Sequence, residues 1–392
     1  MYTLNDVDWK HVVILFGTPA LALVGFATVP LRTATFWWAV AYYFFTGLGI
    51  TAGYHRYWAH RSYDATRVWQ VILMAAGTGA VEGTVKWWSR GHRIHHRFTD
   101  TEKDPYNAKR GFLWSHIGWM IIKQKKNATV DISDLSSDPL VAFQHKYYLP
   151  LAVFMAFIFP TLVAGFGWND WAGGFFFAGV ARLVFVHHAT FCVNSLAHYL
   201  GEFTFDDRRT PKDHFLTALV TLGEGYHNFH HEFPADYRNA IKFWQYDPTK
   251  WTIWFASLVG LTYNLKMFPA NEIEKGRIHM MQKKLDDIKK TLDYGVPVEE
   301  LPVLTFSQVK ERISETGKQL LIISGVVYDV SKFMDDHPGG KGFLRAAVGR
   351  DVTASFNGGV YDHANAARNL MSSMRYARLE GLVPEASVSR ED

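Results

Sequence analysis

Four long apolar stretches constrain what this chain can fold into more than any other feature. They run from Val12 to about Leu31, from Thr33 to Tyr54, from about Leu149 to Trp168 and from Trp171 to about Val193. Each is close to the ~20 residues with which an α-helix crosses a hydrocarbon core of about 30 Å. The aromatic fraction of 16%, with 14 tryptophans, is also common where a protein meets a bilayer interface. We therefore predict four membrane spans, in preference to buried core helices of a large soluble protein.

The charges between these stretches predict on which side of the membrane the remaining chain lies. The links around Arg32 and at residues 167–170 are short, whereas residues 55–148 and the chain after residue 205 hold many lysines and arginines. The positive-inside rule then places the N terminus, the middle segment and the C-terminal half in the cytosol, where they form a helical cap. Residues 68–88 are apolar but broken by glycines and Glu82, which predicts an interfacial or re-entrant helix rather than a fifth span.

The composition excludes several classes of protein. A net charge of +4 without a long basic run does not indicate a nucleic-acid-binding protein. Cys192 is the single cysteine, so neither a disulfide framework nor a cysteine zinc site is expected. The first apolar stretch lacks a basic flank and is too long for a signal peptide, so no cleavable signal is expected. The role of Arg182, His187 and His188, inside the fourth stretch, stays open.

Four short motifs rich in histidine lie beside the predicted spans. They are HRYWAH from His55, HRIHH from His92, NSLAH from Asn194 and HNFHH from His227. Residues three and four apart share one face of a helix, so HRIHH and HNFHH each present three imidazoles in one direction. Spans two and four both run toward the cytosol, so all four motifs should meet at one membrane surface. The candidate metal ligands are His55, His60, His92, His95, His96, Asn194, His198, His227, His230 and His231.

This set of side chains is larger than one metal ion needs. One divalent metal takes about four to six ligands, so nine histidines and one asparagine suit two metals. Imidazole-rich ligands without cysteine favour Fe, Cu, Zn or Ni. The isolated histidines are predicted to be interface or surface residues instead of ligands, and they are His11, His116, His145, His214 and His279.

The four motifs, in this order and with this arrangement of spans, resemble the membrane fatty-acyl desaturases, specifically the acyl-CoA delta-9 (stearoyl-CoA) desaturases. The resemblance covers about residues 5–270, and EGYHNFHHEFPADYRNA and DPTKWTIW look particularly like fungal members. It implies a four-span desaturase fold and two iron ions. One iron would be held by His55, His60, His92, His96 and His230. The other would be held by His95, His198, His227 and His231, with Asn194 acting through a water.

The resemblance implies O2-dependent insertion of a cis double bond into saturated C16/C18 acyl-CoA. Removing hydrogen from an unactivated methylene needs a strong oxidant, which two irons can generate from O2 and side chains cannot supply. The acyl chain would enter a tunnel between the spans. In this family, bulk on the helix of the second span limits chain length. Tyr43 and Gly47 are therefore the candidates for closing the tunnel, with an ordinary interface tyrosine as the alternative for Tyr43.

Three basic residues near the motifs are candidates for binding the CoA phosphates. Arg90, Arg93 and Lys123 carry the charges that recognise phosphate, and lipid head groups are the alternative partners. The family usually has Asp directly before HRxHH and often has Asn nine residues before the first histidine of that motif. This chain has Gly91 and Gly83 at those two places.

The C-terminal segment carries a second pattern. HPGGKGFL at residues 337–344 follows GVVYDVSKF, and His363 lies 26 residues after His337. Two histidines on separate helices of an apolar module can clamp a haem. The segment resembles cytochrome b5 over residues 301–384, which implies a small α+β domain and haem b with His337 and His363 as axial ligands. Gly339 and Gly340 would allow the turn beside the haem. A haem-free remnant of the fold is the alternative.

Bis-histidine ligation leaves no open position on the haem iron, which favours electron transfer over oxygen chemistry. A fused donor would deliver electrons at high effective concentration. These electrons would come from a cytochrome b5 reductase that the chain does not encode.

The predicted organisation is a membrane desaturase domain at residues 1–270, a helical linker at 271–300, the haem domain at 301–384 and a tail at 385–392. The resemblance places the protein in the endoplasmic reticulum membrane, among membrane lipids. A related diiron hydroxylase, or a desaturase acting on lipid-bound chains, is the nearest rival. A non-catalytic haem- or metal-binding membrane protein is the rival from another class.

Overall fold

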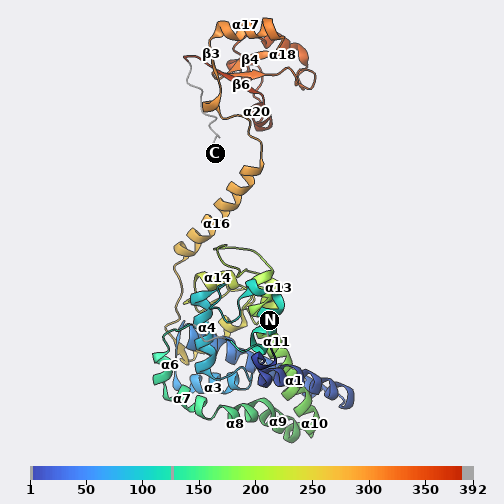
Figure 1. Cartoon of the computed structure of the whole chain (residues 1–392), viewed down its shortest axis with the longest axis vertical. Helices are drawn as coiled ribbons and strands as arrows, with labels where there is room; N and C mark the ends of the chain where they lie inside the picture. The colour runs from blue at the N-terminus through green and yellow to red at the C-terminus, as the bar shows by residue number, and fades with distance from the viewer. Residues whose placement is uncertain (1–2, 125–127, 382–392) are drawn as a thin grey trace. The chain divides into compact units, whose positions relative to one another are not determined.

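The chain folds into two compact units. The computed structural model describes residues 3–124 and 128–381. The first unit comprises Met1–Gln282 and the second unit comprises Lys283–Asp392. Among the described residues the first unit is almost entirely helical, and the second unit holds a four-stranded sheet (Figure 1). The predicted mainly α fold with a small α+β domain is confirmed at this level. The predicted tail, residues 385–392, and the last residues of the predicted haem domain, 382–384, lie outside the described residues.

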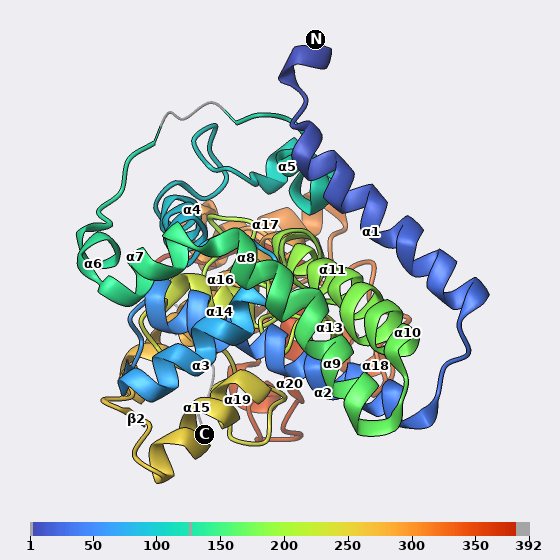
Figure 2. The same cartoon turned by 90° about the horizontal axis from the view of Figure 1, so that it is seen from below.

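The four apolar stretches form four helical rods that lie side by side in the first unit (Figure 2). The first is α1 (Trp9–Thr28). The second is α2 (Thr33–Leu48), which continues into the π-helical η2 (Gly49–Ala59). The third consists of α8 (Tyr148–Val153), η5 (Phe154–Ile158) and α9 (Phe159–Trp168). The fourth consists of α10 (Trp171–Gly173), η6 (Gly174–Ala181) and α11 (Arg182–Asn194), followed by α12 (Leu196–Tyr199).

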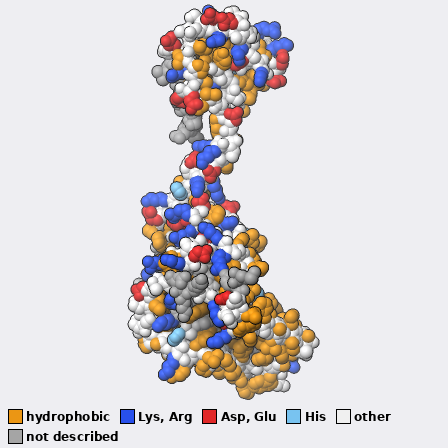
Figure 3. Space-filling model, viewed as in Figure 1, with side chains coloured by type: hydrophobic (Ala, Val, Ile, Leu, Met, Phe, Trp, Pro, Cys, Tyr) orange, Lys and Arg blue, Asp and Glu red, His pale blue; other side chains and the backbone are white. Residues whose placement is uncertain are grey.

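Within the described residues, three helical stretches are long and apolar enough to cross a membrane. They are Trp9–Thr28, Tyr148–Trp168 and Trp171–Tyr199. Hydrophobic side chains gather over the end of the first unit that carries these rods (Figure 3). The predicted second span, Thr33–Tyr54, is not among the three, so the count of four is not confirmed. Its α-helix ends at Leu48, and the π-helical continuation is buried by other parts of the protein.

The cap of the first unit is built from short helices around this bundle. Their bounds are η1 (Leu4–Asp6), α3 (Arg67–Thr78), α4 (Val85–Phe98), η3 (Ala108–Arg110), η4 (Trp114–Gly118), α5 (Trp119–Ile121), α6 (Ser133–Ser137), α7 (Pro139–Lys146), α13 (Phe215–Val220), α14 (His227–Glu232) and α15 (Pro248–Leu258). Two short strands, β1 (Asp64–Ala65) and β2 (Thr262–Tyr263), pair antiparallel. Helix α16 (Ala270–Thr291) covers most of the predicted linker, and the boundary between the two units falls inside it.

Residues 68–88, predicted as one interfacial helix, form two helices joined by a tight turn. Val81 (φ 55°) and Gly83 (φ 97°) adopt left-handed backbone conformations, which no α-helix can accommodate. The side chain of Thr84 then caps α4 by accepting a hydrogen bond from the Trp87 N–H at 3.2 Å. The apolar pattern of the sequence did not reveal this break between α3 and α4. Because of the turn, α4 does not continue along the axis of α3.

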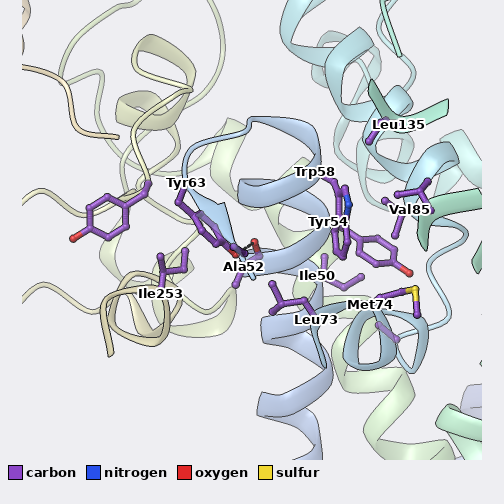
Figure 4. Close-up of a cluster of buried hydrophobic side chains, with 14 of the residues drawn as sticks. Ile50, Ala52, Tyr54, Trp58, Tyr63, Leu73, Met74, Val85, Leu135 and Ile253 are labelled. Atoms are coloured by element: carbon purple, nitrogen blue, oxygen red, sulfur yellow. Dashed lines mark hydrogen bonds between the residues drawn. The ribbon is translucent and has the colours of Figure 1, made fainter. Parts of the chain in front are cut away.

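The core of the first unit packs η2 against α3 and α4. Figure 4 shows the buried cluster around Tyr54, Trp58 and Tyr63 of this region. Burial of each large apolar side chain contributes about 1.5–3 kcal/mol. The closest approach is at Gly49, where a Cβ would lie 2.1 Å from the backbone N of Gly77. Only glycine permits this contact, which holds η2 in a fixed position beside α3.

The second unit is a sheet with helices on both faces. The strands are β3 (Val303–Leu304), β4 (Leu320–Ile323), β5 (Val326–Asp329) and β6 (Arg375–Leu379), in the order β3-β6-β5-β4. Its helices are η7 (Val298–Glu300), α17 (Phe306–Thr316), α18 (Lys341–Ala347), α19 (Thr353–Phe356) and α20 (Asn365–Ser372). All four residues of β4 are buried. Val309 lies in the core on one face of the sheet, and Met334 packs against the core on the other.

Candidate functional site

Nine histidines of the first unit gather into two adjacent groups. Within each group the ring nitrogens lie within 4.8 Å of one another. The first group contains His55, His60, His92, His96 and His230. The second group contains His95, His198, His227 and His231. These memberships are the same as in the predicted division between two metal ions.

Three helices and one π-helix bring these side chains together. Helix α4 carries HRIHH and α14 carries HNFHH, each with its three imidazoles on one face, as their spacing predicts. His55 and His60 are five residues apart, a spacing that would point them in different directions on an α-helix. His55 lies on η2 and His60 caps its C-terminal end, where the His60 N–H donates to the His55 carbonyl at 3.0 Å. This i→i+5 pattern stacks residues five apart, so both rings face the first group.

The ring nitrogens crowd at the centre of each group. In the first group, Nε2 of His60 lies 2.8 Å from Nε2 of His92, and Nε2 of His55 lies 3.0 Å from Nε2 of His230. In the second group, Nε2 of His95 lies 3.2 Å from Nε2 of His231. His198 Nε2 is buried and has no hydrogen-bond partner among the described residues. In each group, the inward-facing ring nitrogens therefore lie close together, and they can direct their lone pairs at a shared ligand.

Outer partners fix the orientation of several of these rings. The Nδ1 atoms of His55 and His95 lie 3.0 Å from Glu224 and 2.9 Å from Asp104. His198 Nδ1 lies 2.7 Å from the Thr210 hydroxyl. A carboxylate accepts a hydrogen bond from Nδ1–H, so Nε2 of His55 and of His95 carries the lone pair. This is the tautomer that a metal ligand needs.

The partner of His55 belongs to a wider buried network. Arg56 donates to Glu224 at 2.8 Å, to Asp247 at 2.9 Å and to the Tyr237 carbonyl at 2.7 Å. Burial opposes ionisation of Glu224, but the charge of Arg56 and the hydrogen bonds from His55 and Arg56 outweigh burial and lower its pKa to about 2. The guanidinium therefore keeps the carboxylate beside His55 charged, which holds that imidazole in place.

Burial sets the protonation of the histidines. Removal from water disfavours the charged imidazolium, and neighbouring imidazoles add to this effect. Together they lower the pKa well below its usual value for His60, His92, His96, His227, His230 and His231. Neutral imidazoles are the form that binds transition metals.

A cavity of about 760 Å³ opens beside the two groups. His55, His92, His95 and His227 contribute to its wall, and so does Asn194. The lining reaches the exposed Lys123 in one direction and the buried Gly47 in the other. A volume of this size is typical of ligand pockets.

Glu82 is part of the wall of this cavity. Its carboxylate accepts hydrogen bonds from Trp88 Nε1 at 3.0 Å and from the Thr190 hydroxyl at 2.7 Å. Burial raises the pKa of Glu82 to about 7. The bridge joins α4 to α11 and fixes the width of the cavity beside the histidines.

The second unit places its two conspicuous histidines opposite each other. The ring centroids of His337 and His363 lie 6.4 Å apart. His337 Nδ1 lies 3.2 Å from the Gly340 carbonyl, and His363 Nδ1 lies 3.1 Å from the Phe356 carbonyl. Both rings are thereby oriented by backbone, and their Nε2 atoms remain for a ligand between them.

Comparison with known proteins gives matches for both units. Residues 33–263 match the family described as fatty acid desaturase, and residues 305–380 match the cytochrome b5-like heme/steroid binding domain. The chain is 55% identical to the probable acyl-CoA desaturase of Schizosaccharomyces pombe, over 96% of this chain and 78% of that protein. It is 48% identical to acyl-CoA desaturase 1 of Saccharomyces cerevisiae, over 96% of this chain and 75% of that protein.

A third relative is the delta(9)-fatty-acid desaturase fat-6 of Caenorhabditis elegans. It is 38% identical over 67% of this chain and 79% of that protein.

The chain belongs to the fatty acid desaturase family.

Both sites of this desaturase fit the metals that such a protein is expected to hold. In the first unit, the two sets of converging imidazoles suit transition metals. In the second unit, a metal bonded at about 2 Å to each of two imidazole nitrogens would separate the ring centroids by roughly 6 Å. The 6.4 Å between His337 and His363 suits a haem iron between them.

The predicted substrate residues of the desaturase divide into two sets. Tyr43, Gly47, Arg90 and Lys123 all line the cavity. Arg93 is not among its lining residues. The Arg93 guanidinium pairs with Asp134 at 2.7 Å and donates to the Trp58 carbonyl at 2.8 Å. The structure therefore gives Arg93 a part in holding η2 against the cap.

Sequence reasoning about the desaturase missed the outer partners of the histidines. Glu224 and His227 stand in a Glu-x-x-His spacing, which could have marked Glu224, although its carboxylate faces His55 and not the centre of a group. Asp104 follows His95 by nine residues in a loop, without a local signal. The isolated His116 pairs with Ser195 and His188, and among the described residues neither of the two groups includes it.

Proposed function

We propose that this chain is an O2-dependent acyl-CoA delta-9 desaturase that inserts a cis double bond into saturated C16/C18 acyl-CoA. One observation carries the proposal: the two histidine groups border the same cavity that extends to the buried Gly47. A cavity of this kind suits an extended apolar chain that passes beside the metals. The names of the yeast and nematode relatives support the substrate class and the delta-9 position.

The two histidine groups would each hold one iron ion, with Asn194 bordering the same cavity. When bound, a pair of irons supplies the oxidising power that hydrogen removal from a methylene requires. Glu224 and Asp104 hold the ligand imidazoles as the neutral tautomer with Nε2 directed inward. Such outer partners typically account for 10–100-fold in metal affinity or activity.

The remaining residues of the cavity would bind and orient the substrate. Arg90 and Lys123 lie on its wall and offer positive charge to the phosphates of CoA. Apolar walls exclude water from the acyl chain, and the Glu82 bridge holds these walls together. Tyr43 donates a hydrogen bond to the Val220 carbonyl at 3.3 Å, which joins α2 to the end of α13. This contact would help to close the tunnel.

The second unit would supply electrons through haem b held by His337 and His363. Desaturation removes two hydrogens from the acyl chain and reduces O2 to two waters, so each turnover needs two electrons. A cytochrome b5 reductase would deliver them one at a time. As a domain plan we propose residues 1–270 for the desaturase, 271–300 for the linker and 301–384 for the haem domain.

We place the protein in the endoplasmic reticulum membrane with four spans. The rod formed by α2 and η2 would be the fourth span, because it lies among the three recognised ones. The N and C termini of the protein and both metal sites would then face the cytosol, where the positive-inside rule places the basic segments.

Expression in a yeast that lacks its own desaturase tests the function. We expect growth without added unsaturated fatty acid, and palmitoleic and oleic acids as products when double bonds are mapped by mass spectrometry. A hydroxy acid, or a double bond at another carbon, would indicate the rival hydroxylase or another regiochemistry. Desaturation of lipid-bound chains in microsomes without acyl-CoA would contradict the proposed substrate.

A further inference from the structure

Two residues from different parts of the chain lie against each other in the buried wall of the cavity. Gly47 of α2 forms one side of this contact, and Leu222, from the turn after α13, forms the other. A Cβ placed on Gly47 would lie 2.5 Å from Cδ1 of Leu222, well inside van der Waals contact. The two residues therefore face each other with no room for one additional carbon. Leu222 is 3% exposed, so its isobutyl group belongs to the interior.

The turn that carries Leu222 is held rigidly. Leu222 itself has φ 55°, a left-handed conformation that costs free energy in a residue with a branched side chain. Its carbonyl accepts a hydrogen bond from the Thr249 hydroxyl at 3.0 Å, and the same hydroxyl contacts that of Thr51 at 2.7 Å. A turn fixed in a strained conformation by its surroundings is a feature of functional sites.

Close backbone contacts on either side prevent this turn from moving outward. A Cβ on Gly225 would lie 2.1 Å from the backbone N of Ala218, and a Cβ on Gly223 would lie 2.7 Å from Cα of Asp247. The side chain of Leu222 can rotate, but its backbone cannot retreat from the cavity. A longer acyl chain would therefore meet the isobutyl group and not a yielding loop.

We propose that Leu222 sets the chain-length limit of this enzyme as the partner of Gly47. The inference rests on the proposed acyl-CoA desaturase activity. It makes Leu222, a residue of the cap, the determinant of the enzyme's specificity for acyl chain length. The contact between Gly47 and Leu222 across the tunnel, and not helix α2 alone, then determines which acyl chain lengths the enzyme accepts. One methylene more or less in an apolar pocket changes specificity by about 10–200-fold. Truncation of Leu222 should therefore produce a measurable change in the preference between acyl chains of different length.

Competition between saturated acyl-CoAs of 14 to 20 carbons tests this proposal. The full-length protein is assayed in microsomes from a yeast without its own desaturase. We expect Leu222→Ala to raise the ratio of C20 to C16 conversion at least tenfold, and Gly47→Ala to lower the ratio of C18 to C16 conversion. In Gly47→Ala/Leu222→Ala the added methyl group meets the vacated space, so the ratio should return toward that of the unmodified enzyme. Such non-additivity is the signature of a direct contact.

Leu216→Ala is the matched control, because Leu216 is 61% exposed on α13 and does not line the cavity. If Leu222→Ala does not accumulate as a single species in size-exclusion chromatography, Gly47→Ala/Leu222→Met replaces it. Methionine keeps the volume but yields more easily, so this pair should recover the C18 product that Gly47→Ala loses. Unchanged ratios, or single-variant effects that simply add, would overturn the proposal. Conversion of no acyl-CoA by the unmodified protein would instead overturn the proposed function.

Discussion

The two histidine sites of this molecule are built in opposite ways. In the first unit, nine histidines are packed in the interior, and their Nε2 atoms approach one another to 2.8–3.2 Å. In the second unit, His337 and His363 are half-buried and stand 6.4 Å apart. Around that pair, Phe343, Val360 and Tyr361 are 66%, 72% and 67% exposed.

This difference shows what each fold contributes to its site. The first unit closes around its ligands and fixes them with carboxylates, so the protein shapes the site before any metal binds. The second unit leaves apolar side chains exposed near the two rings, with backbone carbonyls behind the rings, and a haem would cover these side chains. Exposed apolar side chains gathered in this way typically mark a binding site. The sites should therefore respond differently to substitution.

The largest effect is expected from His95→Ala. It removes a buried ligand from the second group, so non-haem iron and desaturase activity should both fall to background. Haem content should stay unchanged, because the haem site lies in the other unit. Metal analysis and the haem absorption band of the same sample check this. His279→Ala, at an exposed position of α16, is the control, and loss of haem in His95→Ala would contradict the independence of the two sites.

His337→Ala is expected to give the reverse pattern. The haem absorption band should disappear and desaturation in cells should stop, while the non-haem iron is retained. The host must lack a separate cytochrome b5 that could replace the fused donor. Full activity of His337→Ala in such a host would show that the second unit is not the electron donor.

Glu224→Gln should have an intermediate effect. The amide removes the negative charge beside His55 and leaves Arg56 with Asp247 as its remaining carboxylate. We expect iron affinity to fall about 10–100-fold, as for other outer partners of metal ligands, measured by competition with a chelator. Glu272→Gln, on the exposed start of α16, should bind iron like the unmodified protein. Equal affinity in Glu224→Gln would mean that the site does not depend on its carboxylate partners.

Tyr361→Ser is expected to have the smallest effect. The Tyr361 side chain is exposed without haem, so the free energy of unfolding of the haem-free protein should change by about 0.5 kcal/mol or less. Haem should nevertheless dissociate several-fold faster, because its ring loses an apolar contact beside His363. Transfer of haem to an excess of a competing apoprotein measures this rate. A large loss of stability would show that the crevice is part of the folded core.

The sequence predicted the histidine groups well because residues close together in the chain determine which side chains share a helical face. Spacings of three and four residues define one helical face, so HRIHH and HNFHH could be placed on α4 and α14 in advance. His55 and His60 were predicted as ligands from their motif beside the second span, but their five-residue spacing needs the π-helix η2, which no apolar pattern reveals. The change of helix type at Gly49 does not explain why the second stretch is not among the recognised spans, because Tyr148–Trp168 and Trp171–Tyr199 also contain π-helical segments. The tryptophans and tyrosines of the second stretch instead lower its mean hydropathy.

Features that depend on distant contacts could not be predicted in this way. Arg93 has the charge of a phosphate ligand, and only the fold shows that its guanidinium is already bound by Asp134 and three backbone carbonyls. Leu222 belongs to an ordinary apolar segment, and its role follows from the approach of Gly47, a residue far earlier in the chain. The predicted domain boundaries remain predictions, and α16 begins at Ala270, beside the predicted boundary between residues 270 and 271.

The buried Arg56 has a consequence for the order of events during synthesis. Its partner Asp247 follows 191 residues later, and at about 5–20 residues per second a ribosome needs roughly 10–40 s to make that length. Glu224 follows Arg56 by 168 residues, so for most of that interval the guanidinium lacks both carboxylates and His55 lacks its orienting partner. The buried network that holds His55 in place is therefore complete only after the ribosome has passed Asp247.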